Sequence, residues 1–352
     1  MSRKIKYKAA LIGTGRIGFT LGFDRKREQP ASHTMALLNN RRIKLVAACD
    51  NNQPKLDYFH RFVKKPITYA DYSNMFATEK FDIVVIAVNE SSHLDAALVA
   101  IRAKPKLIIL EKPVALTVAD GLKILSESEK YKVPVLVNHE RRFAEDYKIA
   151  KKYINSIGEL ISINAKLDSG LRVYTPEEEK SGFYSLLHDG THLVDIVNYL
   201  LEDENNSFDE TKILYNMELN NVVFDKEKSN VVRFVSANFE SIKCPCVNIS
   251  ISGKSKFFGF EIDVIGTEGR IRIGNGIFEF YRREESKMYT GFYSLTKNTR
   301  IKAPKKTKYF SNMVKNAVDF LDGKADLKSN IQTGLNTLRV LEEIKNRLKS
   351  DF

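Results

Sequence analysis

The first half of the chain alternates short, nearly continuous apolar runs with stretches whose apolar residues recur at helical spacing. Apolar runs of this kind are typical of strands buried on both faces, and the alternation is typical of a parallel sheet covered by helices. The expected strands are Tyr7–Ile12, Lys44–Cys49, Ile83–Val88, Leu107–Leu110 and Val133–Val137, and the expected helices are Thr34–Asn39, Ser91–Ala103 and Thr117–Tyr131. We therefore expect a doubly wound domain over residues 1–140.

After Gly158 the pattern changes to strands that follow one another with few helices between them. The expected strands are Leu160–Leu167, Ile213–Glu218, Val231–Phe239, Val247–Ser252, Phe257–Ile265 and Ile277–Tyr281, with helices at Asp189–Leu201 and Gln332–Lys349. Sequential strands favour an open, mainly antiparallel sheet. The overall fold class is therefore α/β, with a second, α+β domain over residues 141–352.

Composition limits the classes of protein that fit. The chain has 352 residues, 43% hydrophobic and 28% charged, as in globular proteins that fold in water. The longest apolar run, Ile83–Val88, is far shorter than the roughly 20 residues of a membrane-spanning helix. The cysteines Cys49, Cys244 and Cys246 are too few and too unevenly spaced for a disulfide framework. We expect a cytoplasmic protein that does not enter a membrane.

The net charge admits more than one kind of partner. Lys and Arg number 56 and Asp and Glu 44, which gives +12, a balance that suits nucleic acid, anionic sugars and nucleotides, or solubility alone. Lysines are scattered over the whole chain, and the densest group, residues 302–308, has no nucleic-acid-binding motif. We therefore expect a small-molecule partner and no nucleic acid.

A glycine-rich turn follows the first expected strand directly. Its residues are Gly13, Thr14, Gly15, Arg16, Ile17 and Gly18, which match the pattern G-x-G-x-x-G. Such glycines allow a tight turn, let a pyrophosphate approach the backbone and leave a helix N-terminus facing its charge. The motif is weak by itself, but at the first strand of an alternating β/α series it predicts a dinucleotide site.

The second expected strand is followed by Asp50, where this fold places an acid that binds the ribose hydroxyls of NAD. The other interpretation is a simple turn residue, since Asn51 and Asn52 follow. Asp50 lies farther from the glycine turn than the usual spacing of about 20 residues. Residues 21–32, a polar segment, read as an insertion that accounts for part of this distance.

Together these motifs resemble the glucose-fructose oxidoreductase and inositol dehydrogenase family of NAD(P)-dependent oxidoreductases. The matching segments are Gly13 to Gly18, His33 with Ala36, Val88 to His93, Glu111-Lys112-Pro113, Arg141 to Phe143, His188 to His192, and Gly266 to Gly269. The resemblance implies hydride transfer between a nicotinamide and a sugar, cyclitol or nucleotide-linked sugar. It also implies a homo-oligomer formed through the C-terminal sheet.

The resemblance assigns roles around Glu111-Lys112-Pro113, at the carboxyl edge of the sheet. Lys112 lies beside the nicotinamide and the reacting carbon, where its ammonium can donate a proton to a developing alkoxide. Glu111 lies near the nicotinamide ribose, and Val88, Asn89 and His93 join the cofactor site. The cofactor is NAD, with NADP less favoured because Asp50 would repel its 2′-phosphate.

The segment His188-Asp189-Gly190-Thr191-His192 supplies the remaining catalytic candidates. The resemblance assigns His192 to the substrate oxygen, but the family commonly has an aspartate at the position of His188. Either His188 or Asp189 therefore orients the catalytic groups. Two histidines and an aspartate so close together can also bind a metal ion, and His188 or Asp189 can simply cap the following helix. We expect hydride chemistry and no metal.

Two rival functions stay open. One keeps the redox chemistry but changes the substrate to an imine or a carbon-carbon double bond. The other is a protein that binds NADH as a sensor and has no turnover, because fold alone does not settle function.

Overall fold

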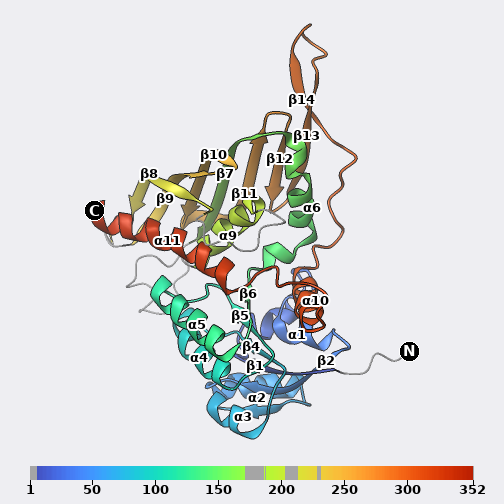
Figure 1. Cartoon of the computed structure of the whole chain (residues 1–352), viewed down its shortest axis with the longest axis vertical. Helices are drawn as coiled ribbons and strands as arrows, with labels where there is room; N and C mark the ends of the chain where they lie inside the picture. The colour runs from blue at the N-terminus through green and yellow to red at the C-terminus, as the bar shows by residue number, and fades with distance from the viewer. Residues whose placement is uncertain (1–5, 171–185, 187, 203–212, 228–230, 352) are drawn as a thin grey trace. The chain divides into compact units, whose positions relative to one another are not determined.

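The computed structural model describes residues 6–170, 186, 188–202, 213–227 and 231–351. The chain forms two compact units (Figure 1). The first consists of Met1–Ala144 and Lys306–Leu335, and the second of Glu145–Lys305 and Asn336–Phe352.

A six-stranded parallel sheet is the base of the first unit. Its strand order is β3-β2-β1-β4-β5-β6, with helices covering both faces, so all residues of β4 and β5 are buried. The strands are β1 Tyr7–Ile12, β2 Ile43–Cys49, β3 Ile67–Tyr69, β4 Ile83–Ile86, β5 Leu107–Glu111 and β6 Val135–Asn138. The helices are η1 Thr20–Phe23, α1 His33–Leu38, α2 Gln53–Phe62, α3 Tyr72–Thr78, η2 Glu90–Ser92, α4 His93–Arg102, α5 Val118–Tyr131, η3 Glu140–Phe143 and α10 Tyr309–Leu321. The expected doubly wound domain is confirmed.

Local sequence explains several of these boundaries. The side chains of Ser32, Asn52, Asp71 and Thr117 accept hydrogen bonds from the first turns of α1, α2, α3 and α5 and so fix where each helix begins. The strand expected from Val133 begins two residues later, because Pro134 has no N–H to donate to a neighbouring strand. β3, α2 and α3 were not expected.

The first unit also contains a segment from near the C-terminus, residues 306–335. Phe310, Met313 and Val314 of α10 are buried in the core cluster that also contains Leu11 and Phe143. The division after Ala144 lies close to the expected one after residue 140, but residues 306–335 lie in the first unit and not in the second. The apolar face of α10 is the physical reason, because it completes the core beside α1 and η3.

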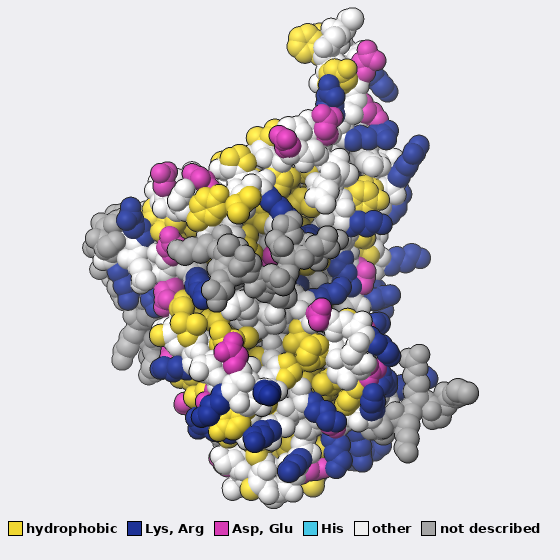
Figure 2. All heavy atoms as spheres, viewed as in Figure 1, with side chains coloured by type: hydrophobic (Ala, Val, Ile, Leu, Met, Phe, Trp, Pro, Cys, Tyr) yellow, Lys and Arg dark blue, Asp and Glu magenta, His cyan; other side chains and the backbone are white. Residues whose placement is uncertain are grey.

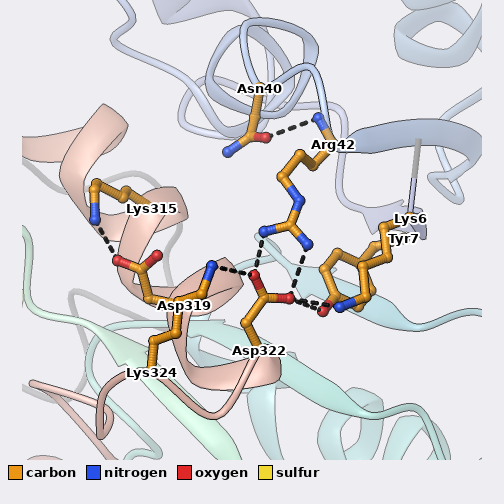
Figure 3. Close-up of polar contacts among 8 residues, drawn as sticks. All are labelled: Lys6, Tyr7, Asn40, Arg42, Lys315, Asp319, Asp322 and Lys324. Carbon is orange, nitrogen blue, oxygen red and sulfur yellow. Dashed lines mark hydrogen bonds and ion pairs between the residues drawn. The ribbon is translucent and has the colours of Figure 1, made fainter. Parts of the chain in front are cut away.

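A polar cluster at the end of α10 fastens this segment to β1 (Figure 3). The carboxylate of Asp322 accepts hydrogen bonds from Tyr7 Oη at 2.6 Å, from Lys6 Nζ at 2.8 Å and from the guanidinium of Arg42. The Arg42 guanidinium, followed by Lys6 and Tyr7, holds the pKa of this carboxyl well below its usual range. The cluster therefore joins segments more than 300 residues apart by charge-assisted bonds.

The second unit is built on an eight-stranded mixed sheet in the order β14-β13-β12-β11-β7-β10-β9-β8. Among the described strands, β7 and β10 pair in parallel, and the other neighbours are antiparallel. The strands are β7 Leu160–Gly170, β8 Tyr215–Phe224, β9 Val232–Ser241, β10 Cys244–Ser252, β11 Lys254–Gly266, β12 Gly269–Gly274, β13 Ile277–Glu285 and β14 Tyr293–Lys297. The helices are α6 Glu145–Tyr153, η4 Ile154–Ile157 and α9 Gly190–Leu201, and α11 Ile331–Asp351 crosses from the first unit into this one. The expected mainly antiparallel sheet is confirmed.

One face of this sheet is covered and the other is open. In β7, Ile163, Ala165 and Leu167 are buried, while the alternate residues Asn164 and Lys166 are exposed. Period-two alternation of this kind places one row of side chains against the helices and the other row toward solvent. The β13–β14 hairpin ends in exposed apolar side chains at its tip (Figure 2).

Among the described residues, no helix is both long enough and apolar enough to span a membrane. Figure 2 shows Lys and Arg side chains spread among acidic and apolar ones over the face in view.

Candidate active site

The glycine turn at the end of β1 has two glycines where close packing leaves no room for a side chain, and a third that lies beside open space. Gly13 has a φ of +96°, and a Cβ there would lie 2.3 Å from the carbonyl oxygen of Ala87. A Cβ on Gly18 would lie 2.0 Å from the carbonyl oxygen of Gly13. A Cβ on Gly15 would meet nothing within 4 Å. This space, beside backbone that carries no side chain, is what a pyrophosphate needs for a close approach, so these residues fit a dinucleotide.

The chain after this turn differs from the sequence prediction. The prediction placed a helix N-terminus here, but the structure has one helical turn, in which the N–H of Phe19 donates to Gly15 O at 2.9 Å, followed by η1. The insertion comes next, and α1 starts only at His33. Arg16 is exposed and Ile17 is half-buried. A bound pyrophosphate would therefore meet the amides of a single turn and not the dipole of a long helix.

Asp50 follows β2 and is bonded to the glycine turn. Its Oδ2 accepts hydrogen bonds from Thr14 N at 2.8 Å and from Thr14 Oγ1 at 3.1 Å, and its Oδ1 accepts one from Asn52 N at 3.0 Å. A carboxylate has about four acceptor positions, so about one stays available for a ribose hydroxyl. The contact of Asp50 with ribose stays a prediction, and the structure adds that Asp50 also holds the turn.

The insertion at residues 21–32 is anchored at both ends. Phe23 lies edge-on to Phe19, with ring centroids 5.1 Å apart, and packs against Phe62 of α2. The carboxylate of Glu28 accepts hydrogen bonds from the backbone N–H groups of Thr307 at 2.7 Å and Lys308 at 2.6 Å, just before α10. The insertion therefore fastens the glycine turn to α2 and to the start of α10.

Glu111 ends β5 and lies at the centre of a buried polar group. Its Oε1 lies 2.6 Å from His33 Nε2 and accepts a hydrogen bond of 2.6 Å from Asn138 Nδ2. Burial alone would raise the pKa of this carboxyl, but the hydrogen bonds from His33 and Asn138 and the charge of Lys112 outweigh it and lower the pKa. Glu111 is therefore ionised beside Lys112. Its predicted contact with a nicotinamide ribose stays a prediction.

His93 connects the loops that follow β4 and β5. The ring is completely buried, with Nδ1 2.7 Å from the carbonyl oxygen of Pro113 and Nε2 3.2 Å from that of Val88. Burial lowers the pKa of this imidazole. Val88 is half-buried and Asn89 is exposed. His93 therefore positions the loops around Lys112, and the cofactor contacts predicted for these three residues stay predictions.

The other catalytic candidates surround the start of α9 in the second unit. This helix begins at Gly190, one residue after the predicted start, and its N-cap residue, Asp189, makes no capping bond with its side chain. The N–H of His192 donates to Asp189 O at 3.1 Å, and His188, Asp189 and His192 are all half-buried. The proposed catalytic roles of these side chains remain predictions, as does that of Lys112 in the first unit.

The grouping of His188, Asp189 and His192 raised a metal site as an alternative. Within the parts of the chain that the structure describes, no three His, Cys, Asp or Glu side chains are arranged to hold a metal ion.

Two polar residues at this site were not among the predicted functional residues. Asn138 ends β6, in register with Glu111 on β5, and His33 begins α1. The available signal was the rule that the carboxyl ends of parallel strands meet at one edge, which places Asn138 beside Glu111. His33 is one of the residues that carry the resemblance, but the sequence assigns it no role.

Part of the chain is similar to known oxidoreductases. Residues 7–139 match the model of the GFO/IDH/MocA family, described as an oxidoreductase family with an NAD-binding Rossmann fold. Inositol 2-dehydrogenase of Salmonella typhimurium is 25% identical over 205 residues, which cover 56% of this chain and 55% of that protein. D-apiose dehydrogenase of Rhizobium rhizogenes is 26% identical over 240 residues, 66% of each chain. The inositol dehydrogenase match thus spans about half of that relative's length.

Solved structures show the same fold over almost the whole chain. The WlbA dehydrogenase of Bordetella pertussis, solved with NADH and UDP-GlcNAcA, has a TM-score of 0.75 and 16% identity, covering 99% of this chain and 97% of that one. A dehydrogenase from Chromobacterium violaceum has a TM-score of 0.77 and 16% identity, covering 97% and 95%. Residues 7–139 therefore match the NAD-binding Rossmann domain of the GFO/IDH/MocA oxidoreductase family, and parts of the chain are similar to an inositol 2-dehydrogenase and a D-apiose dehydrogenase.

Proposed function

We propose that the protein is an NAD-dependent dehydrogenase that interconverts a secondary alcohol and a ketone on a sugar, cyclitol or nucleotide-linked sugar. One observation carries the proposal. The open space at Gly15 lies at the carboxyl edge of the sheet, and Lys112 and the ionised Glu111 lie at the same edge. The relatives named as inositol and D-apiose dehydrogenases support the substrate class.

Bound NAD would accept or supply the hydride at its nicotinamide C4, and the chain's own residues handle binding and protons. The glycine turn would bind the pyrophosphate through backbone amides, and Asp50 would accept a hydrogen bond from a ribose hydroxyl. In the direction of reduction, the Lys112 ammonium donates a proton to the carbonyl oxygen of the substrate as this oxygen gains negative charge. In the direction of oxidation, Lys112 acts as the neutral amine, which receives the hydroxyl proton and becomes the ammonium.

His192 would be the second group that binds the substrate oxygen, and His188 or Asp189 would orient it. Variants distinguish these two candidates. If Asp189 orients His192, Asp189→Asn should lower turnover strongly and His188→Asn only slightly, and the reverse should hold if His188 does so. Equal, small effects from both variants would assign the segment a structural role.

Fluorescence titration with NADH, followed by turnover with a panel of sugars, cyclitols and sugar nucleotides, tests the proposed activity. Saturable NADH binding together with turnover on a member of this panel supports it. NADH binding without turnover on any member would instead support a sensor, and turnover only on imines or enoyl compounds would move the protein to another substrate class.

We also propose a homo-oligomer formed through the open face of the second unit's sheet. This face carries ion pairs between neighbouring strands, such as Arg270 Nε with Asp263 Oδ1 at 2.7 Å, and exposed residues such as Asn164. Sedimentation equilibrium should show an oligomer that Asn164→Arg weakens. The control Ile242→Arg, at the exposed β9–β10 turn, should leave it intact. A monomeric parent protein would contradict the proposal.

A cytoplasmic location is proposed from the cysteines. Cys49, Cys244 and Cys246 are free thiols, and Cys246 is exposed, which suits a reducing compartment. Fractionation of the source cells would test it.

A further inference from the structure

The buried group around Glu111 uses only one of the two carboxylate oxygens. Oε1 binds both His33 Nε2 and Asn138 Nδ2, each at 2.6 Å, whereas Oε2 accepts no hydrogen bond from the residues that the structure describes. Because the carboxylate is an acceptor, His33 Nε2 carries a proton and donates it. Two short, charge-assisted bonds to one oxygen fix the rotation of the carboxylate and so the direction of Oε2.

The buried group of Glu111, His33 and Asn138 contributes less to the free energy of unfolding than apolar side chains in the same space would. Nδ1 of His33 and Oδ1 of Asn138 are buried and have no hydrogen-bond partner among the described residues. Leaving a buried polar atom unpaired costs about 1–3 kcal/mol, and apolar side chains of similar size could fill the same space at no such cost. A buried carboxylate held by two side chains that each leave one polar atom unsatisfied is more readily explained by function than by packing.

The group also links separate parts of the first unit. The N–H of His33 donates to Ile17 O at 3.0 Å, and Thr34 Oγ1 donates to Gly18 O at 2.7 Å, so His33 is fixed to the end of the glycine turn. Phe310 of α10 lies edge-on to the His33 ring, with centroids 5.0 Å apart. Asn138 lies at the end of the neighbouring strand β6, in register with Glu111. Glu111 is therefore held between the glycine turn and the last strand, directly before Lys112 in the chain.

From this geometry we propose that His33 and Asn138 are positioning residues for hydride transfer. They hold the Glu111 carboxylate in one orientation, as a fixed negative charge beside Lys112, and so place the Lys112 ammonium for proton transfer. The inference rests on the proposed dehydrogenase function and adds to it two residues that act through Glu111.

Steady-state kinetics of two His33 variants test this role. His33→Leu removes the donor, and loss of a hydrogen bond to a charged group should lower kcat by about 10- to 100-fold. Its Kd for NADH and its KM should stay within about threefold of the parent values, because the bond is proposed to act in the transition state and not in the binding of cofactor or substrate. His33→Gln keeps an N–H donor and should recover most of the lost kcat. Asn138→Leu should resemble His33→Leu.

A double-mutant cycle separates positioning from general damage. In a Lys112→Met background, His33→Leu should lower kcat no further, because both changes act through the same group. Asn316→Ala is the structural control. Its buried amide donates to Asp326 O at 2.8 Å in the same unit, outside this group, so the change should lower the melting temperature and leave kcat unaltered.

The outcomes are distinguishable. A parent protein without turnover on the whole substrate panel would refute the proposed function and the positioning role with it. An active parent whose His33→Leu variant keeps its kcat would refute the positioning role alone. Failure of His33→Gln to restore kcat while the protein stays folded, or additive losses in the Lys112→Met background, would likewise overturn it.

Discussion

The open space beside Gly15 allows cofactor binding to be changed without damage to the fold. Gly15→Ala adds a methyl group that, apart from its two chain neighbours, meets no described atom within 4 Å, at a residue whose φ is not in the left-handed region. Alanine also restricts the unfolded chain, so the free energy of unfolding should stay level or rise by about 0.4–1 kcal/mol. The methyl group would occupy the position that a bound pyrophosphate needs.

The expected loss of affinity follows from the cost of overpacking. Forcing one extra methyl group into a filled site costs about 1–3 kcal/mol, and about 1.4 kcal/mol corresponds to a tenfold change in Kd. The Kd for NADH should therefore rise by about 5- to 150-fold in Gly15→Ala. Fluorescence titration measures the Kd, and circular dichroism during heating measures the melting temperature.

Gly13→Ala is the matched comparison, because there the Cβ would lie 2.3 Å from Ala87 O at a φ of +96°. The melting temperature of this variant should fall, and its affinity for NADH should fall as well. If Gly15→Ala kept both its stability and the parent's Kd, the pyrophosphate would not lie at this turn, and the assignment of the cofactor site would fail.

Three further outcomes follow from the site and the fold. Lys112→Met should keep the Kd for NADH within a few fold and lower kcat by about a hundredfold or more, since a positioned proton donor contributes about 10²–10⁴; weaker NADH binding with unchanged kcat would assign Lys112 to the cofactor. The carboxylate of Asp50 should favour NADH over NADPH by about tenfold or more in parallel titrations, and equal affinities would point to the basic residues 25–27 as a phosphate site. Asp322→Asn should lower the melting temperature at pH 7. The pKa of Asp322 is lower in the folded protein than in the unfolded chain, so the ionised carboxylate stabilises the fold at pH values above the unfolded pKa of about 3.9. This stabilisation is lost as the pH falls further. The melting temperatures of the parent protein and of Asp322→Asn should therefore converge in acid. A constant difference between pH 7 and pH 3 would contradict this account.

The sequence predicts the central strands of the first unit, but it does not predict the edge strand β3 or the helix α10. Tyr7–Ile12 was predicted with both ends correct, because strands buried on both faces leave continuous apolar runs. β3 has only three residues, none of them fully buried, which is too short for any periodic pattern. α10 follows a lysine-rich stretch, and its apolar face has meaning only once α1 and η3 are in place.

The same limit applies to the candidate site. The glycine turn and Lys112 are recognisable because each belongs to a short, continuous motif. The contact of His33 with Glu111 joins residues 78 positions apart and depends on how the insertion returns the chain to the sheet edge. Single-sequence reasoning gives the edge at which such side chains meet, but not the hydrogen bonds that they form there.

The return of residues 306–335 bears on how this protein could be divided or recombined. A fragment that stops near residue 140 would lack Phe310 and Met313, which fill the core of the first unit, and Asp322, which binds Arg42. Such a fragment would expose the apolar surface that α10 covers and would be prone to aggregate. An exchange of cofactor-binding halves between relatives must therefore transplant two separated pieces of gene, with one junction inside the continuous helix α11.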